Sequence, residues 1–417
     1  MPERFRFGRN VAVLLGGEMF SRGLNFLAFS RLARLLSLPG YGLLELVQAL
    51  MIFGTLFVDL GTGRVGTREI ATKEGPPLSD LVCRIVSMQL TLSICVVGLV
   101  VIFISFVPVA PALKRLIVGF AVSLLGFPFL LGWIFQGQSQ MASIAALQVV
   151  RRLVFLVLTI VLVHGPADLF LIPWAEIVAV SVAGIGYIAL MSSAGEPVRM
   201  NLRHGYDLQL LRQGLPIGGS QLVWACRTYL PMVLLATQFN QASIAFFGAA
   251  LRIVMVLQAL IGAYFVTLFP AMSELSSQPA AAFIRLLHRS LRLTLGPIVA
   301  LAVVLTLGAP LIMRLVFGAK FVLPEASSTL AVLIWLLPIT SFRRHYSDAL
   351  IALRHQGEEL ACSLVGVALL VALILHLRSS SSNVTAGAWA MLVSEFVGAA
   401  LTWWWLRRHL VAAAAEV

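Results

Sequence analysis

Three arginines lie inside stretches of sequence that otherwise predict membrane-spanning helices: Arg22, Arg227 and Arg252. An arginine at the centre of a bilayer costs about 2.5–3.5 kcal/mol on insertion scales. Such residues therefore usually face a protein interior or a water-filled cavity, where they meet an anion or a counter-charge. The sequence thus predicts that the membrane interior of this protein holds a negative group.

The local surroundings of the three arginines differ. Glu18 and Arg22 are four residues apart and share one helix face, which leaves open a structural ion pair or a cavity arginine tuned by the glutamate. Arg227 and Arg252 have no acidic residue three or four positions away. They are expected on neighbouring antiparallel spans at interior depth, able to approach each other. Two guanidinium groups without a local counter-charge suit a phosphate, because their planar geometry matches its oxygens. The alternative is that both arginines have a structural role.

Further polar side chains accompany these arginines. Asn25 lies on the first predicted span, and Gln221, Tyr229 and Gln258 lie on the two spans that carry Arg227 and Arg252. These groups could line a sugar path, or they could form interhelical hydrogen bonds worth less than about 2 kcal/mol each. Asp59, at the end of the second span, is expected either to cap or pair locally or to couple transport to a proton or sodium ion. Glu176 and Glu395 are further candidates for coupling.

The composition indicates an integral membrane protein. The chain has 417 residues, of which 59% are hydrophobic and only 12% are charged, against about 25% charged in an average soluble protein. Apolar runs of about 20 residues recur along it, as membrane-spanning helices require. The four cysteines show no CxxC spacing, and the seven histidines are scattered at span ends, so we expect no metal cluster and no cofactor.

Hydropathy and helix-breaking residues predict twelve spans. They lie near residues 11–33, 43–63, 82–107, 113–135, 144–164, 169–192, 213–236, 243–270, 291–316, 326–347, 360–377 and 385–406. Loops on one side then carry 20 of the 30 Lys and Arg residues, Arg343 and Arg344 among them, and loops on the other side carry seven. Because cytoplasmic loops are rich in Lys and Arg, both termini are expected in the cytoplasm. The net charge of +12 then reflects topology, and no nucleic-acid partner is expected.

The spans divide into two halves. We predict an N-terminal six-helix bundle over residues 1–195, a cytoplasmic linker over 196–212 and a C-terminal six-helix bundle over 213–417. Each half opens with a glycine pair followed by an arginine: Gly16-Gly17 with Arg22, and Gly218-Gly219 with Arg227. Two six-helix halves are a common plan in transporters.

One motif resembles a nucleotide fingerprint. The run Gly61-Thr62-Gly63-Arg64-Val65-Gly66 spells GxGxxG. An apolar span precedes it and another begins near Val82, so no strand–helix–strand unit fits around it. We interpret it as a flexible, cationic cytoplasmic turn.

Several segments resemble one family, the polysaccharide (oligosaccharide) flippases of the MATE-like exporter superfamily. The segments that carry this resemblance are Pro39-Gly40-Tyr41-Gly42, Asp59-Leu60-Gly61, Arg68-Glu69-Ile70-Ala71, Leu215-Pro216, Phe247-Gly248 with Arg252, Leu268–Leu275 and Leu350–Arg354. The resemblance implies twelve to fourteen helices in two bundles around a central cavity. It also implies that Arg22, Arg227 and Arg252 are counterparts of the cavity arginines with which related lipid II flippases hold a pyrophosphate.

The sequence therefore predicts an all-α integral membrane protein that is not an enzyme. The expected function is to flip a polyprenyl-pyrophosphate-linked oligosaccharide from the inner to the outer leaflet of a bacterial inner membrane, by alternating access of a cationic cavity. Expected partners are this lipid-linked sugar, membrane lipids, and a polysaccharide polymerase with its chain-length machinery. The alternatives are a multidrug or cation antiporter of the same superfamily and a membrane polysaccharide polymerase or ligase.

Overall fold

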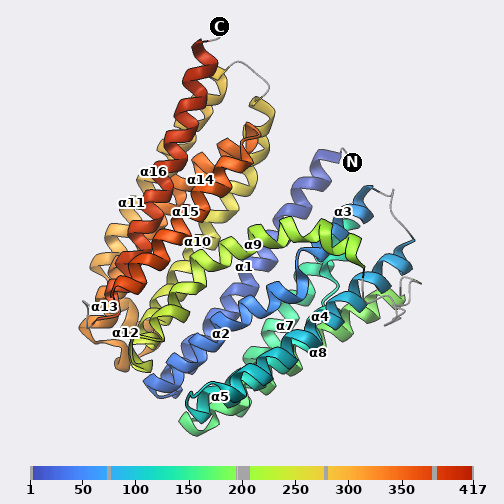
Figure 1. Ribbon diagram of the computed structural model, residues 1–417, viewed down its shortest axis with the longest axis vertical. Coiled ribbons are helices and arrows are strands. Elements are labelled where there is room, and N and C mark those ends of the chain that lie inside the picture. The colour runs from blue at the N-terminus through green and yellow to red at the C-terminus, as the bar shows by residue number, and fades with distance from the viewer. Residues whose placement is uncertain are drawn as a thin grey trace. The chain divides into compact units, whose positions relative to one another are not determined.

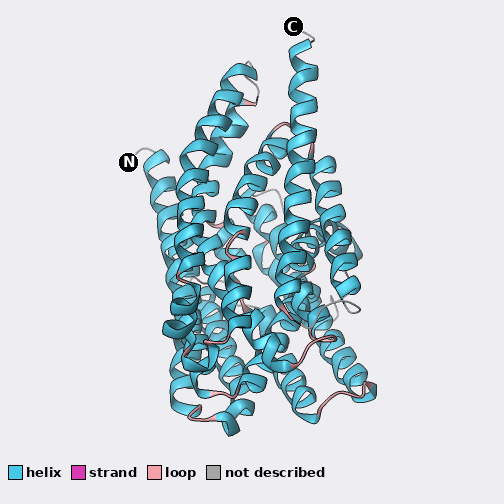
Figure 2. Cartoon of the chain, turned by 90° about the vertical axis from the view of Figure 1, so that its left-hand side faces the viewer, coloured by secondary structure: helices cyan, strands magenta, loops and turns pink. Residues whose placement is uncertain are grey.

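The computed structural model describes residues 3–72, 77–193, 195, 207–276, 280–377 and 383–415. Every regular element in these residues is a helix, and none is a strand (Figure 2). The chain forms two compact units, residues 1–225 and 226–417. The predicted boundary between the bundles, at 196–212, stays a prediction, and residues 196–206 lie outside the described part of the chain.

The first unit contains eight α-helices and the start of a ninth among its described residues (Figure 1). These helices are α1 (Glu3–Leu35), α2 (Leu38–Asp59), α3 (Thr62–Thr72), α4 (Leu78–Phe106), α5 (Pro111–Ser123), α6 (Gly132–Gly137), α7 (Met141–Leu162), α8 (Ile172–Ser193) and α9 (Leu208–Leu235). Two 3₁₀ segments, η1 (Leu124–Phe129) and η2 (Pro166–Leu171), precede α6 and α8. α1 packs along α7, α7 packs on α8, and α2 lies against α4 and α5.

The second unit holds the end of α9 and seven further α-helices in its described residues. They are α10 (Gln241–Leu275), α11 (Ala280–Leu307), α12 (Ala309–Phe317), α13 (Pro324–Leu333), α14 (Leu336–Ala352), α15 (Gln356–Leu377) and α16 (Thr385–Ala415), with a 3₁₀ turn, η4 (Ala319–Phe321), after α12. α14 is the central helix of this unit, because α10, α11, α13, α15 and α16 all contact it. More than half of the described residues of α14 are buried, Arg343 among them.

The helices agree with the predicted membrane spans. All twelve predicted spans fall on helical segments, and ten of the described segments are long and apolar enough to cross a membrane. The other two are α1 and α9, which carry Arg22 and Arg227 and several further polar residues. The prediction of an all-α membrane protein is confirmed, and ten of its twelve predicted spans are apolar enough to cross a membrane.

The GxGxxG run differs from its prediction. It is not a flexible turn, because Thr62 to Thr72 form the helix α3. Leu60 and Gly61 have positive φ angles of 42° and 79° and turn the chain sharply between α2 and α3. Asp59 caps the new helix: its carboxylate oxygens accept hydrogen bonds from the N–H groups of Gly61, at 3.1 Å, and Gly63, at 3.0 Å. The side-chain cap satisfies backbone donors that would otherwise lack a partner.

The beginning of α9 is tied to the same turn. The backbone at Gly61 lies so close to α9 that a Cβ there would sit 2.5 Å from the Gly214 carbonyl oxygen. Asp207 caps α9 by accepting from the Leu210 N–H at 3.0 Å, and it also forms an ion pair with Arg84 of α4. Burial acts to raise the pKa of Asp207, but the Leu210 N–H and the Arg84 guanidinium outweigh it and hold this pKa below its usual value.

Candidate functional site

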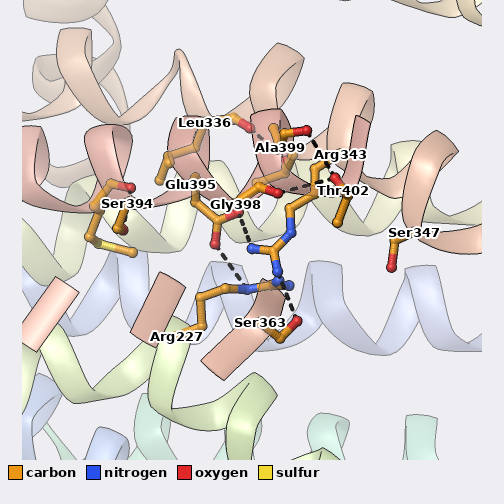
Figure 3. A network of polar contacts seen from close by, with 12 residues as sticks. Arg227, Leu336, Arg343, Ser347, Ser363, Ser394, Glu395, Gly398, Ala399 and Thr402 are labelled. Atoms are coloured by element: carbon orange, nitrogen blue, oxygen red, sulfur yellow. Dashed lines mark hydrogen bonds and ion pairs between the residues drawn. The ribbon is translucent and has the colours of Figure 1, made fainter. Parts of the chain in front are cut away.

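A buried ion network occupies the core of the second unit (Figure 3). Glu395 of α16 accepts from two arginines: Arg227 Nε lies 2.9 Å from its Oε1, and Arg343 Nη1 lies 3.1 Å from its Oε2. The exposed fraction is 5% for the glutamate side chain, 3% for Arg343 and 27% for Arg227. The network therefore joins three helices, α9, α14 and α16, through one carboxylate.

Arg343 also contacts a chain of hydroxyl and carboxylate groups on α14 and α15. Its Nη2 donates to Ser363 Oγ of α15 at 2.8 Å, and Ser363 donates in turn to Glu359 Oε1 at 2.9 Å. Ser347, one turn further along α14, donates to the same Glu359 oxygen. These contacts fix the guanidinium of Arg343 from two sides.

Glycine makes room for this guanidinium. A Cβ at Gly398 of α16 would lie 2.8 Å from Arg343 Nη1 and 3.0 Å from its Cζ. Gly366 of α15 faces the same nitrogen, with a Cβ position 3.8 Å away. Gly398 therefore allows α16 to pack closely over the charged side chain of Arg343, whereas the contact at Gly366 would be an ordinary van der Waals contact.

The groups that could bind an anion at this site are the two guanidinium groups, which here pair with Glu395. Glu395 satisfies part of the donor capacity of Arg343 and Arg227, and each guanidinium has five N–H donors in a planar fork. Ionisable residues inside membrane-spanning helices are expensive and usually functional. The 27% exposure of Arg227 means that a group outside the network can reach it, whereas Arg343 is closed off.

The structure corrects the prediction that Arg227 is unneutralised. Its partner, Glu395, lies on another helix, so a search of positions three or four residues away could not find it. The assignment of Arg343 to a cytoplasmic loop was also wrong, because this residue lies buried within α14. Its place inside the predicted span 326–347 could have indicated that Arg343 is buried. Arg344 is the next residue, and the adjacent pair of arginines was assigned to a loop together.

Arg22 forms the predicted pair with Glu18, with 2.6 Å between its Nη2 and the carboxylate. The two side chains are 45% and 41% exposed. This pair is therefore much more exposed than the pair of Arg343 and Glu395. A role for either residue in a cavity stays a prediction. Asn25, on the same helix, has a buried Oδ1 without a hydrogen-bond partner among the described residues.

The remaining predicted residues fall in several places. Arg252 lies partly buried in α10, and its approach to Arg227 stays a prediction. Gln258 donates to Thr340 of α14 at 3.3 Å. It thus forms an interhelical hydrogen bond, which was one of the two roles predicted for it. Gln221 and Tyr229 are partly buried in α9.

Asp59 and Glu176 both have structural partners in the first unit. Beyond capping α3, Asp59 accepts from Gln89 Nε2 at 3.0 Å. Glu176 of α8 pairs with Arg151 of α7, and Arg152 lies 3.9 Å away. The two arginines, counted as loop residues from the sequence, thus neutralise a buried acid between two helices. For Asp59 these contacts are the local capping that was the predicted alternative to a coupling role, and a coupling role for Glu176 stays a prediction.

The expectation that the histidines are scattered is wrong for two of them. His355, between α14 and α15, and His409, near the end of α16, stack with ring centroids 3.6 Å apart. Their separation in sequence concealed this contact, which depends on how α16 packs against α15.

The fold is shared with a known class of membrane proteins. It superimposes on the inward-facing conformation of a multidrug resistance MATE family transporter of the MOP superfamily with a TM-score of 0.77, at 16% identity over 94% of this chain and 95% of that chain. The lipid II flippase MurJ in an inward closed conformation gives a TM-score of 0.78, at 13% identity over 95% of this chain and 87% of that chain. The helices and the buried ion network thus belong to a protein with the MATE-like exporter fold.

The sequence comparison identifies the family. The model of the family described as "Polysaccharide biosynthesis protein" matches residues 7–276, and the chain belongs to this family. It is 22% identical over 417 residues to a "Putative O-antigen transporter" of Escherichia coli (strain K12), which covers 96% of this chain and 97% of that protein. A protein of the same description from Shigella dysenteriae is 22% identical over 251 residues, covering 60% of this chain and 63% of that protein. The family resemblance seen in the sequence is confirmed.

Proposed function

We propose that this protein is a flippase that moves a polyprenyl-pyrophosphate-linked oligosaccharide from the inner to the outer leaflet during surface polysaccharide synthesis. The observation that carries the proposal is the buried Arg227–Glu395–Arg343 network inside a bundle of membrane-spanning helices. Membership of the polysaccharide biosynthesis family and the likeness to an O-antigen transporter support the substrate class.

The network suggests how a pyrophosphate is held. Arg343 and Glu395 form a closed, neutral pair that Ser363 and Glu359 support. Arg227 is the member with exposed surface, so it can exchange the carboxylate for a phosphate oxygen while Glu395 stays neutralised by Arg343. A guanidinium binds phosphate and carboxylate with the same planar geometry, which makes this exchange possible without rebuilding the site. Arg22 and Arg252 would supply further positive charge to the cavity during alternating access.

The proposal includes the location and partners of the protein. It places the chain in a bacterial inner membrane with both termini in the cytoplasm, where the excess of Lys and Arg in the loops favours that orientation. The lipid tail would stay in the bilayer, and a polymerase with its chain-length machinery would receive the flipped glycan. The protein would transport this substrate without altering it chemically.

Replacing Arg227 by alanine should reduce flipping by about tenfold to a hundredfold, because a charge-assisted hydrogen bond contributes about 1.5–3 kcal/mol. The measurement uses proteoliposomes loaded with a fluorescent polyprenyl-pyrophosphate oligosaccharide, and follows its appearance in the opposite leaflet. The apparent melting temperature should change little, since Arg343 still neutralises Glu395.

The matched control is Arg314→Ala, which removes an exposed arginine from α12 of the same unit. It should flip the substrate like the unmodified protein. Equal flipping by a folded Arg227→Ala variant would remove the phosphate role from this residue. Transport of cationic dyes in place of the lipid-linked sugar would instead support the multidrug antiporter.

A further inference from the structure

A three-residue cluster with metal-binding chemistry lies in the second unit, apart from the ion network around Glu395. His355 follows α14, Glu358 lies in the first turn of α15, and His409 lies near the end of α16. Each offers one ligand atom, and the three atoms all lie within 4.8 Å of one another. The cluster therefore joins two segments that are far apart in sequence.

The distances within the cluster suit a tetrahedral ion. His355 Nδ1 lies 3.3 Å from Glu358 Oε1, and His409 Nε2 lies 3.6 Å from the same oxygen. Zinc binds nitrogen and carboxylate oxygen at about 2.0–2.2 Å, so two ligand atoms on a tetrahedral zinc are about 3.3–3.6 Å apart. The two distances from the shared carboxylate oxygen to the imidazole nitrogens match the separation of two ligand atoms on one zinc ion.

One ligand atom, His409 Nε2, lies 3.6 Å from Glu358 Oε1 and forms no hydrogen bond among the described residues. This nitrogen is also shielded from solvent. A buried polar atom without a partner is costly, and an ion between His409 and Glu358 would satisfy it. Trp405 stacks on the His409 ring at 5.8 Å, and the His355 ring stacks on it at 3.6 Å. Because a metal lies in the plane of each imidazole that binds it, one of the two histidine rings must turn out of this stack when both bind an ion.

The chain geometry also directs His355 toward the cluster. α14 ends at a left-handed residue, Arg354, with φ of 66°, and the His355 N–H then donates to the Leu350 carbonyl at 2.9 Å. This is a helix-ending turn that usually uses glycine or asparagine. The turn reverses the chain immediately before His355 and sets it one helical turn from Glu358.

We propose that His355, Glu358 and His409 bind a divalent cation of the zinc class. Two imidazoles and one carboxylate favour zinc over magnesium or calcium, which prefer all-oxygen sites. Three protein ligands leave the fourth tetrahedral position to water. The bound ion would connect the C-terminal end of α16 to the turn between α14 and α15. It would therefore hold one end of α16, the helix that carries Glu395.

Zinc binding by the purified, chelator-treated protein tests the proposal. Calorimetric titration with zinc chloride should give one site per chain, and zinc should raise the apparent melting temperature. The affinity tag must lack histidine, and a Cys95→Ser background removes the exposed thiol, which could bind zinc by itself. Magnesium at the same concentrations should give neither signal.

The variants His355→Asn and His409→Gln should each weaken zinc binding by at least about tenfold, because losing even an outer partner of a metal ligand costs about 10–100-fold in affinity. The matched control is His164→Gln, which changes an exposed histidine in the first unit. The proposal fails if the unmodified protein binds no stoichiometric zinc, or if His409→Gln binds it as tightly as the control. Neither outcome depends on the flippase activity.

Discussion

Replacing Glu395 by glutamine should destabilise the protein by about 3–5 kcal/mol, the usual cost of removing one partner from a buried ion pair. Two arginines share this carboxylate, and the substitution leaves both without it. Arg343 is affected most, since only 3% of its side chain is exposed and water cannot replace the lost charge. Ser363 keeps its hydrogen bond to Arg343 but brings no charge.

The matched control is Glu18→Gln, which also removes the acidic partner of an arginine on a predicted span. The Glu18–Arg22 pair is almost half exposed, and pairs of this kind contribute about 0–1 kcal/mol. The apparent melting temperature in detergent, followed by tryptophan fluorescence and gel filtration, should therefore fall sharply for Glu395→Gln and little for Glu18→Gln. Similar shifts in the two variants would contradict the assignment of Glu395 as the shared counter-charge.

The cost of the Glu395 network bears on its function. Apolar replacement of a complete buried ion network is often neutral or stabilising, so stability alone does not explain why a membrane protein contains one. The network also leaves one member, Arg227, partly accessible. This accessibility supports the proposal that Arg227 is the residue that meets the anionic substrate.

The helices of this protein were predictable because the membrane leaves the backbone little choice. Backbone N–H and C=O groups in lipid must be satisfied within the segment, so a long apolar run forms a helix whatever its neighbours are. All twelve predicted spans accordingly fall on helical segments. The Glu18–Arg22 contact was also predictable, because residues four apart lie on the same face of a helix.

Contacts between distant helices were not predictable in this way. Arg227 and Glu395 meet because α9 and α16 are near each other, and no periodicity in either segment contains that information. The stacking of His355 on His409 has the same origin. Counting charges along the chain also misplaced Arg343, because an arginine near the end of an apolar run is assigned to a loop unless a partner for it is known.

The glycine pair Gly218-Gly219, in the first half of α9, gives the second large effect. A Cβ at Gly218 would lie 2.9 Å from the carbonyl carbon of Leu60 and 3.0 Å from its oxygen, both backbone atoms that cannot rotate away. At Gly219, the next residue, nothing lies within 4 Å of the same position. Gly218→Ala should therefore push α9 from the turn between α2 and α3 and cost about 1–3 kcal/mol, as overpacking does.

Gly219→Ala should leave the protein unchanged or stabilise it by up to about 1 kcal/mol, because alanine favours the helix more than glycine does. The two variants differ by one position in the same helix, so their helix propensities are matched and only the contact with Leu60 separates them. Apparent melting temperatures in detergent should fall for Gly218→Ala alone. If both variants melted together, the close approach of α9 to the turn would not contribute to stability. A difference confined to Gly218 would show that the first half of α9 is held by the first unit, while its second half carries Arg227 to Glu395.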